Sequence, residues 1–131
     1  MARILVIDDD QLFVKLIVAA LAKRGHDVEF AFDGIPGMKL ALASHFDAVI
    51  CDMVMPNQEG LQTIRDLRHR FPHLAIVAIS GGLSLLSKLE VLEIASKLGA
   101  DLTIKKPFKM SELTDAVDRA MALRSVPAAS C

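Results

Sequence analysis

Tryptophan and tyrosine are absent from this chain of 131 residues, and cysteine occurs only twice. Two cysteines cannot supply the disulfide framework that holds many small secreted domains together. Cys51 falls in an uncharged run that we expect to be a buried strand, and Cys131 is the last residue. This use of cysteine is typical of a protein in a reducing cytoplasm.

The chain also lacks an excess of charge of one sign and lacks any long apolar run. It has 15 Lys and Arg against 16 Asp and Glu, which gives a formal net charge of −1. Because nucleic-acid binding requires a concentration of basic side chains, we expect no nucleic acid among the partners. No apolar stretch approaches the length of a membrane span, and the first apolar run, which follows Met1-Ala2-Arg3, is too short for the apolar core of a signal sequence. We therefore expect a soluble, cytoplasmic protein that does not bind a membrane.

Hydrophobic residues make up 53% of the chain and charged residues 24%, which is typical of a globular domain. Short strand-like runs alternate five times with segments in which apolar residues recur at helical spacing. This alternation predicts an α/β fold, a doubly wound parallel sheet with helices on both faces. We expect one domain over residues 1–124 and a flexible tail over 125–131.

The predicted strands and helices have definite limits in the sequence. The expected strands are Ile4–Ile7, Val28–Phe32, Ala48–Cys51, Leu74–Ile79 and Leu102–Ile104. The expected helices are one that ends at Gly25, one containing Met38–Ala43, one through Leu61–Arg68, one that ends at Gly99, and one over Glu112–Leu123.

Carboxylates directly follow two of the uncharged runs. Asp8, Asp9 and Asp10 come after the first run, and Asp52 ends the third. Ligands of open α/β sheets bind outside the carboxyl ends of the strands, where these side chains would meet. Crowded carboxylates repel one another unless a cation joins them, and all-oxygen ligands suit a hard divalent ion. The pattern therefore predicts a Mg²⁺ site and phosphate chemistry.

Polar side chains also follow the fourth and fifth predicted strands. Ser80 ends the fourth strand, and Lys105 and Lys106 follow the fifth. A carboxylate can accept a phosphoryl group whose oxygens a hydroxyl and an ammonium then neutralise. Each residue also has an ordinary explanation, because Asp10 can be a helix N-cap, Ser80 a turn residue and either lysine a surface group. Their joint placement, one after each of four strands, favours a common site.

Several segments resemble the receiver domain of two-component response regulators, and the resemblance covers about residues 2–123. The matching segments are Ile4–Asp10, Asp52–Gly60, Ser80–Gly82, Gly99–Asp101 and Lys106–Phe108. The resemblance implies the flavodoxin-like (βα)5 fold, whose five-stranded parallel sheet has the order 2-1-3-4-5.

The resemblance also implies the residues of the metal site. Asp52 would be the phosphoacceptor, and Asp8 and Asp9 would be the acidic pair that holds Mg²⁺. Asp52 and the backbone carbonyl of Val54 would complete the protein's share of the coordination.

Two further side chains would contact the phosphoryl group itself. The Ser80 hydroxyl would bond a phosphoryl oxygen, and the Lys106 ammonium would neutralise part of the phosphoryl charge. Lys106 is the matching lysine because it directly precedes Pro107, and the bond between these two residues is expected to be cis.

The resemblance implies that a histidine kinase or a histidine phosphotransfer protein supplies the phosphoryl group. Phosphorylation would move Ser80 and change the surface formed by the fourth helix, the fifth strand and the fifth helix. A downstream protein target would bind that surface. The protein would be a stand-alone response regulator. It would catalyse only its own phosphorylation and dephosphorylation and would not be an enzyme that acts on a separate substrate.

Two features depart from the usual pattern of this family. Relatives usually have Tyr or Phe three positions before the lysine, at the switch position, whereas this chain has Thr103, which cannot sweep the volume of an aromatic ring. The segment between Ser80 and Gly99 is longer than usual by about one helical turn. It contains a stripe that either folds back onto the domain or binds a target or a second copy in a homodimer. The stripe consists of Leu85, Leu89 and Leu92.

Two other classes of protein remain as alternatives. A degenerate receiver would bind proteins without being phosphorylated, but the acid pair, Asp52, Ser80 and Lys106 argue against it. An enzyme or cofactor protein of the same topology is disfavoured. An aspartyl-phosphate phosphatase would have Asp in place of Val54, and a flavin protein would have a loop rich in Ser, Thr and Gly after the first strand.

Overall fold

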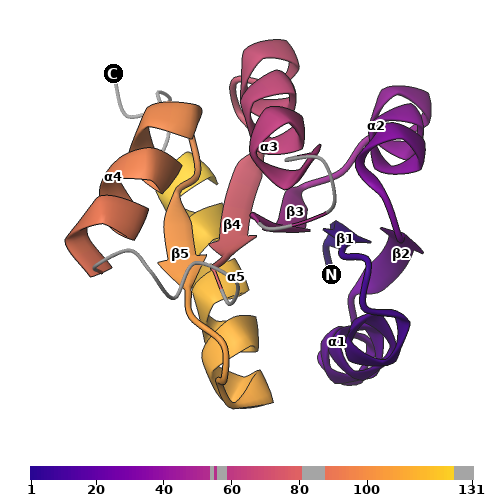
Figure 1. Cartoon of the computed structure of the whole chain (residues 1–131). Coiled ribbons are helices and arrows are strands. Elements are labelled where there is room, and N and C mark those ends of the chain that lie inside the picture. Colours follow the sequence, from indigo (N-terminus) through magenta and orange to yellow (C-terminus); the bar gives the residue numbers. More distant parts are fainter. Residues whose placement is uncertain (54, 56–58, 81–87, 126–131) are drawn as a thin grey trace.

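The computed structural model describes residues 1–53, 55, 59–80 and 88–125 of the chain, in which strands and helices alternate (Figure 1). The strands are β1 (Arg3–Ile7), β2 (Asp27–Ala31), β3 (Ala48–Asp52), β4 (Ala75–Ile79) and β5 (Leu102–Ile104). The helices are α1 (Gln11–Lys23), α2 (Gly34–Ala43), α3 (Glu59–Arg70), α4 (Lys88–Leu98) and α5 (Met110–Ser125). Across the described ranges, no helix combines the length and the apolar character that crossing a membrane requires.

The strands form one parallel sheet in the order β2-β1-β3-β4-β5, which confirms the predicted fold class and strand order. The register pairs Ile7 with Cys51 and Asp52 with Ile79. The carboxyl ends of β1, β3 and β4 therefore meet at one edge of the sheet. This is the edge where the sequence places its carboxylates and its serine.

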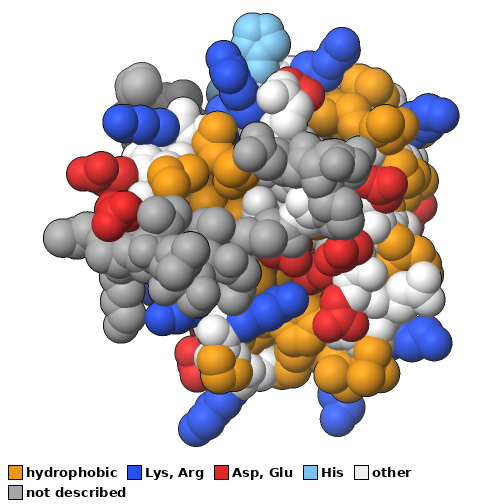
Figure 2. All heavy atoms as spheres, in the orientation of Figure 1, with side chains coloured by type: hydrophobic (Ala, Val, Ile, Leu, Met, Phe, Trp, Pro, Cys, Tyr) orange, Lys and Arg blue, Asp and Glu red, His pale blue; other side chains and the backbone are white. Residues whose placement is uncertain are grey.

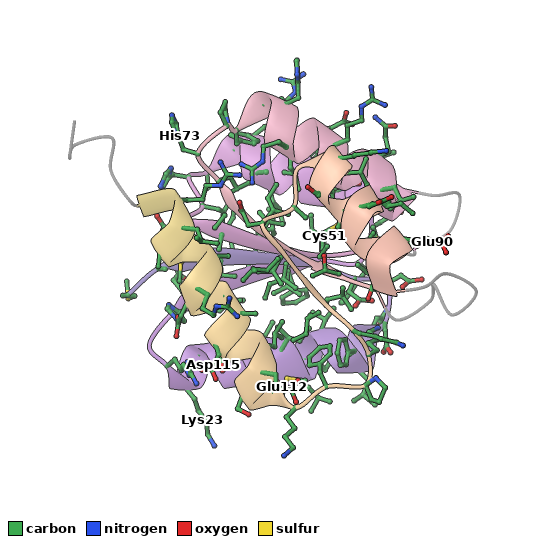
Figure 3. All side chains as sticks on the ribbon, turned by 90° about the vertical axis from the view of Figure 1, so that its left-hand side faces the viewer. Lys23, Cys51, His73, Glu90, Glu112 and Asp115 are labelled. Carbon is green, nitrogen blue, oxygen red and sulfur yellow. The ribbon has the colours of Figure 1, made fainter. Side chains whose placement is uncertain are left out.

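Helices cover both faces of the sheet, with α2, α3 and α4 on one side and α1 and α5 on the other (Figures 1 and 3). Successive side chains of a strand point to opposite faces, so Leu5 and Ile7 belong to one core while Ile4 and Val6 belong to the second. Because both faces are buried, the inner strands are uncharged runs without alternation, which explains why they were recognisable in the sequence.

Aspartates fix the beginnings of the first two helices. Asp10 is the N-cap of α1, and its side chain accepts a hydrogen bond from the Phe13 N–H. Asp33 caps α2, which begins at Gly34, earlier than the Met38–Ala43 segment recognised in the sequence. The early start is possible because Pro36 lies in the first turn, where its missing N–H would have no helical partner.

A charge cluster joins α3, β4, β5 and α5 at the edge of the sheet opposite the carboxylates. Asp101, whose side chain is 8% exposed, accepts hydrogen bonds from Arg68 (3.0 Å), Arg124 (2.7 Å) and the Ile76 N–H (2.8 Å). Arg68 also donates through Nε to the carbonyl of Gly99, at the end of α4 (2.8 Å). We call Arg68, Asp101 and Arg124 the Asp101 cluster.

Replacing Asp101 with alanine is expected to lower the free energy of unfolding by about 3 kcal/mol, because it leaves a buried backbone N–H and the half-buried Arg68 without their carboxylate. Urea denaturation measures the change. The control is Asp115→Ala, which removes an exposed ion pair with Arg24 and should cost less than about 1 kcal/mol. Equal losses in the two variants would contradict the role given to the Asp101 cluster.

Candidate functional site

Three of the carboxylates predicted from the sequence meet at the carboxyl edge of the sheet. Ligand oxygens of Asp8, Asp9 and Asp52 all lie within 4.8 Å of one another. Asp8 follows β1 and Asp52 ends β3, and both are buried, whereas Asp9 is exposed. Acidic side chains are visible near the centre of the face in Figure 2, beside a basic one. Asp10 instead serves as the helix cap.

These three residues fit a magnesium ion by chemistry and by spacing. Mg²⁺ takes oxygen ligands at about 2.1 Å in octahedral geometry, so opposite ligands lie about 4.2 Å apart. Only two of three ligands can be opposite, and adjacent ligands lie about 3.0 Å apart at this bond length, so the three oxygens, which lie within 4.8 Å of one another, would move closer together around the ion. The exposed position of Asp9 leaves an open side at which water could complete the coordination.

Opposing influences act on the pKa of the buried Asp8 carboxyl. Burial raises its pKa, and the neighbouring charge of Asp9 adds to the rise. The hydrogen bond from the Asp10 N–H (2.9 Å) and the Lys106 ammonium act in the opposite direction. A cation bound between the carboxylates would therefore favour the ionised form of Asp8.

The turn after β5 brings Lys106 to the carboxylates. Its Nζ lies 3.5 Å from Asp8 Oδ2 and 4.0 Å from Asp52 Oδ2, and its side chain is 28% exposed. The peptide bond between Lys106 and Pro107 is cis, as expected from the sequence. The neighbouring Lys105 is exposed. The structure thus places the ammonium of Lys106 at the acid cluster.

Ser80 is buried at the end of β4, and both of its hydrogen-bond donors point to β5. Its N–H and its hydroxyl donate to the carbonyl of Ile104, at 3.0 Å and 3.4 Å. The second distance is long for a bond between a hydroxyl and a carbonyl, so the hydroxyl is weakly held. Thr103, at the switch position, is half-buried in β5 opposite Ala78.

Other site residues expected from the sequence cannot be placed. Val54, whose carbonyl is the expected metal ligand, and Leu85 lie outside the described residues. The side chains of Leu89 and Leu92 lie outside them as well, although both residues belong to α4. The carbonyl ligand and the leucine surface therefore stay predictions.

The sequence pattern does not reveal that two further residues, Phe13 and Gly60, contact the site. Phe13 counted only as one of the apolar residues that predict α1, yet its ring lies beside Lys106. Gly60 counted only as the end of a matching segment, yet a Cβ there would overlap the carbonyl oxygen of Asp52 and lie 2.7 Å from the carbonyl carbon of Met53. Only the position of Phe13, three residues after the acidic run, could have signalled the first contact.

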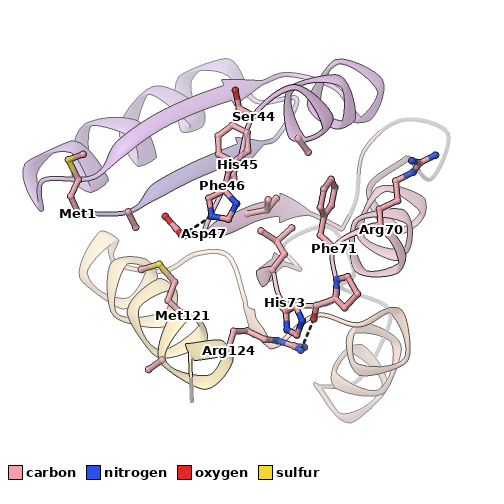
Figure 4. Close-up of a pocket in the computed structure, with 16 residues that line it drawn as sticks. Met1, Ser44, His45, Phe46, Asp47, Arg70, Phe71, His73, Met121 and Arg124 are labelled. Atoms are coloured by element: carbon pink, nitrogen blue, oxygen red, sulfur yellow. Dashed lines mark hydrogen bonds and ion pairs between the residues drawn. The ribbon is translucent and has the colours of Figure 1, made fainter. Parts of the chain in front are cut away.

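A pocket of about 620 Å³ lies at the opposite, amino-terminal edge of the sheet (Figure 4). Apolar side chains such as Phe46, Phe71 and Met121 line it, and Arg124 at its rim donates to the carbonyl of Pro72. The three carboxylates follow the other ends of the strands and do not line this pocket. The acid cluster, and not the pocket, therefore has the groups needed for phosphoryl chemistry.

Comparison with known proteins agrees with the geometry. The model of the family described as "Response regulator receiver domain" matches residues 4–118. The chain is 34% identical over 125 residues to the response regulator MprA of Mycobacterium sp. (strain KMS), covering 95% of this chain and 52% of the relative. It is 32% identical over 111 residues to the transcriptional regulatory protein DltR of Streptococcus agalactiae serotype III (strain NEM316), covering 85% of this chain and 48% of the relative.

A solved structure of a response regulator receiver domain protein from Clostridium thermocellum has the same fold. It aligns with a TM-score of 0.84 at 28% identity, covering 96% of this chain and 98% of that one. The chain thus spans about half the length of the curated relatives it matches and nearly all of the solved receiver domain.

Proposed function

The chain belongs to the response regulator receiver domain family of two-component signalling proteins, and we propose that it accepts a phosphoryl group on Asp52 from a histidine kinase or a histidine phosphotransfer protein. One observation carries the proposal. The Asp52 carboxylate lies with Asp8 and Asp9 in a cluster that fits Mg²⁺, and the Lys106 ammonium lies 4.0 Å from its Oδ2. This set can hold a nucleophile, a cation and a phosphoryl group together.

In the proposed reaction, a carboxylate oxygen of Asp52 attacks the phosphorus of a phosphohistidine. A new bond between Asp52 oxygen and phosphorus forms while the bond between phosphorus and the histidine nitrogen breaks, and the nitrogen keeps the electron pair. The Lys106 ammonium would stabilise the negative charge on a phosphoryl oxygen. When bound between the carboxylates, Mg²⁺ would supply the remaining charge compensation.

The response would begin with the Ser80 hydroxyl. It now donates a long hydrogen bond to Ile104, and a phosphoryl oxygen on Asp52 would be a stronger, charged acceptor. Exchange of the acceptor would alter the contact between the end of β4 and the end of β5. We propose that this change reaches the surface of α4, β5 and α5, where a downstream protein would bind. This proposal does not require the rotation of an aromatic ring at the switch position, where the chain has Thr103.

Incubation with acetyl phosphate and Mg²⁺, followed by intact mass measurement, tests the proposal. We expect addition of one phosphoryl group to the wild-type chain and none to Asp52→Asn, which has the same size but is a poor nucleophile. A wild-type chain that stays unmodified would favour the degenerate receiver. A modified Asp52→Asn variant would place the phosphoryl group on another residue.

The exposed face of α1 suits the approach of a phosphoryl donor. Leu12 and Leu16 lie one turn apart on α1 and are 70% and 51% exposed. This pair, the α1 leucine pair, begins next to the acid cluster because Asp10 caps the same helix. Exposed leucines beside a reactive carboxylate provide apolar area for a protein partner. We propose that the kinase or phosphotransfer protein docks there.

The phosphoryl donor for this test is the histidine kinase that, within a purified panel, phosphorylates the wild type fastest. Replacing Leu16 with aspartate is expected to slow phosphotransfer from this kinase more than about tenfold, because a charge then enters the apolar contact. The rate with acetyl phosphate should not change, since a small donor needs no docking face. Leu123→Asp is the matched control, as Leu123 is also exposed but lies near the end of α5. Equal rates in all three chains would exclude the α1 leucine pair as the docking face.

A further inference from the structure

The ring of Phe13 contacts the lysine of the acid cluster. Lys106 Nζ lies 4.3 Å from the centroid of the Phe13 ring. The Phe108 ring packs against Phe13 in an edge-to-face arrangement, with centroids 5.4 Å apart and planes at 71°. The Phe13 ring, which belongs to α1, thus lies between the Lys106 ammonium and the Phe108 ring. Both of these groups belong to the turn that follows β5. Such packing limits the rotation of the Phe13 side chain.

Four interactions connect this ring and the acid cluster in a closed cycle. The Asp10 N–H donates to Asp8 Oδ1, and the Phe13 N–H donates to Asp10 Oδ1. The Phe13 ring faces the Lys106 ammonium, and this ammonium lies 3.5 Å from Asp8 Oδ2. The hydrogen bonds that start α1 therefore also set the position of the ring relative to Asp8.

We infer that Phe13 is a positioning residue for Lys106, which holds the ammonium at the acid cluster by a cation–π contact. A lysine side chain has a long flexible stem, and fixing it costs conformational entropy. The face of an aromatic ring attracts a cation without competing for the oxygens that the ammonium must neutralise. The inference rests on the proposed function, because it concerns the orientation of the group that would meet the phosphoryl oxygens.

The rate of phosphorylation by acetyl phosphate in Phe13→Leu and Phe13→Tyr tests the inference. Acetyl phosphate excludes any contribution of Phe13 to the docking of a protein. We expect a loss of about fivefold in the leucine variant, which corresponds to a contact of about 1 kcal/mol, and a rate close to that of the wild type in the tyrosine variant. Equal losses in both variants, or no loss in either, would overturn the inference.

A double-mutant cycle separates positioning from a merely structural role. In a Lys106→Met background, Phe13→Leu should cause no further loss, because the group on which the ring acts is gone. The same fivefold loss in that background would overturn the inference, since the ring would then act through the fold alone.

Proton NMR of the chain without a phosphoryl donor gives a readout that does not depend on the reaction. The ε-methylene protons of Lys106 should be shifted upfield by the ring in the wild type and in Phe13→Tyr, but not in Phe13→Leu. An unshifted wild-type signal would overturn the inference. A shifted signal in a chain that acetyl phosphate fails to modify would support the contact and refute the proposed function.

Discussion

Replacing Lys106 with methionine is expected to slow phosphorylation of Asp52 by acetyl phosphate about 100-fold, the usual loss when one preorganised charge at a transition state is removed. Methionine keeps much of the length of the side chain and removes its charge. The ammonium lies within 4.0 Å of both buried carboxylates, so it is close to the oxygen on which the phosphoryl group would form. Time-resolved intact mass measurement gives the rate.

Binding of Mg²⁺ should survive this substitution, because Lys106 competes with the metal for Asp8 and does not itself supply a ligand. Isothermal titration with MgCl₂ measures this binding. Lys105→Met is the matched control. It removes the same charge from the neighbouring, exposed residue and should leave the rate unchanged. If both variants were slowed equally, the net charge of the turn, and not the position of one ammonium, would explain the effect.

Replacing Gly60 with alanine is expected to be the most disruptive small change near the site. A Cβ on the first turn of α3 would overlap the carbonyl oxygen of Asp52 and crowd the backbone of Met53. Backbone cannot rotate away as a side chain can, so α3 and the end of β3 must separate. We expect a loss of about 3 kcal/mol in the free energy of unfolding, measured by urea denaturation. We also expect at least tenfold slower phosphorylation, since Asp52 is displaced.

Gly37→Ala provides the comparison for this prediction. Gly37 is also buried in a helix, but the three atoms nearest to its added Cβ belong to the side chain of Ile7, namely Cδ1 at 2.6 Å, Cγ1 at 2.8 Å and Cγ2 at 3.3 Å. A side chain can shift or change rotamer more readily than a backbone carbonyl can move, and alanine is a better helix former than glycine, so the two effects partly offset. A loss of stability in Gly37→Ala as large as in Gly60→Ala would contradict the reasoning from backbone contact.

The acid cluster could be predicted from the sequence because parallel strands make their ends local features. Buried strands are uncharged on both faces, so the point where charge begins marks the edge of the sheet. This rule yields Asp8, Asp9, Asp10 and Asp52, and the structure brings three of them together while Asp10 caps α1. The choice of Lys106 over Lys105 required the resemblance to the receiver family, because the two differ only in the residue that follows.

The contacts of Phe13 and Gly60 could not be predicted because they depend on how separate elements pack. Phe13 fits the apolar repeat of α1, and the repeat gives the side of the helix but not the neighbour of each ring. The close approach of Gly60 to Asp52 depends on the distance between α3 and β3, which no local pattern encodes. The hydrogen bond of Ser80 to Ile104 likewise depends on how β4 and β5 pair.

The Asp101 cluster has a consequence for any motion of α4. Arg68 holds the carbonyl of Gly99, at the carboxyl end of this helix, and the same arginine binds Asp101 just before β5. The helix has 11 residues and is therefore about 16 Å long. With that end anchored, a displacement of α4 becomes a tilt about Gly99, and its amplitude is greatest at the far end, around Lys88. A protein that distinguishes two tilts of this helix would do so best by contacting its first turn.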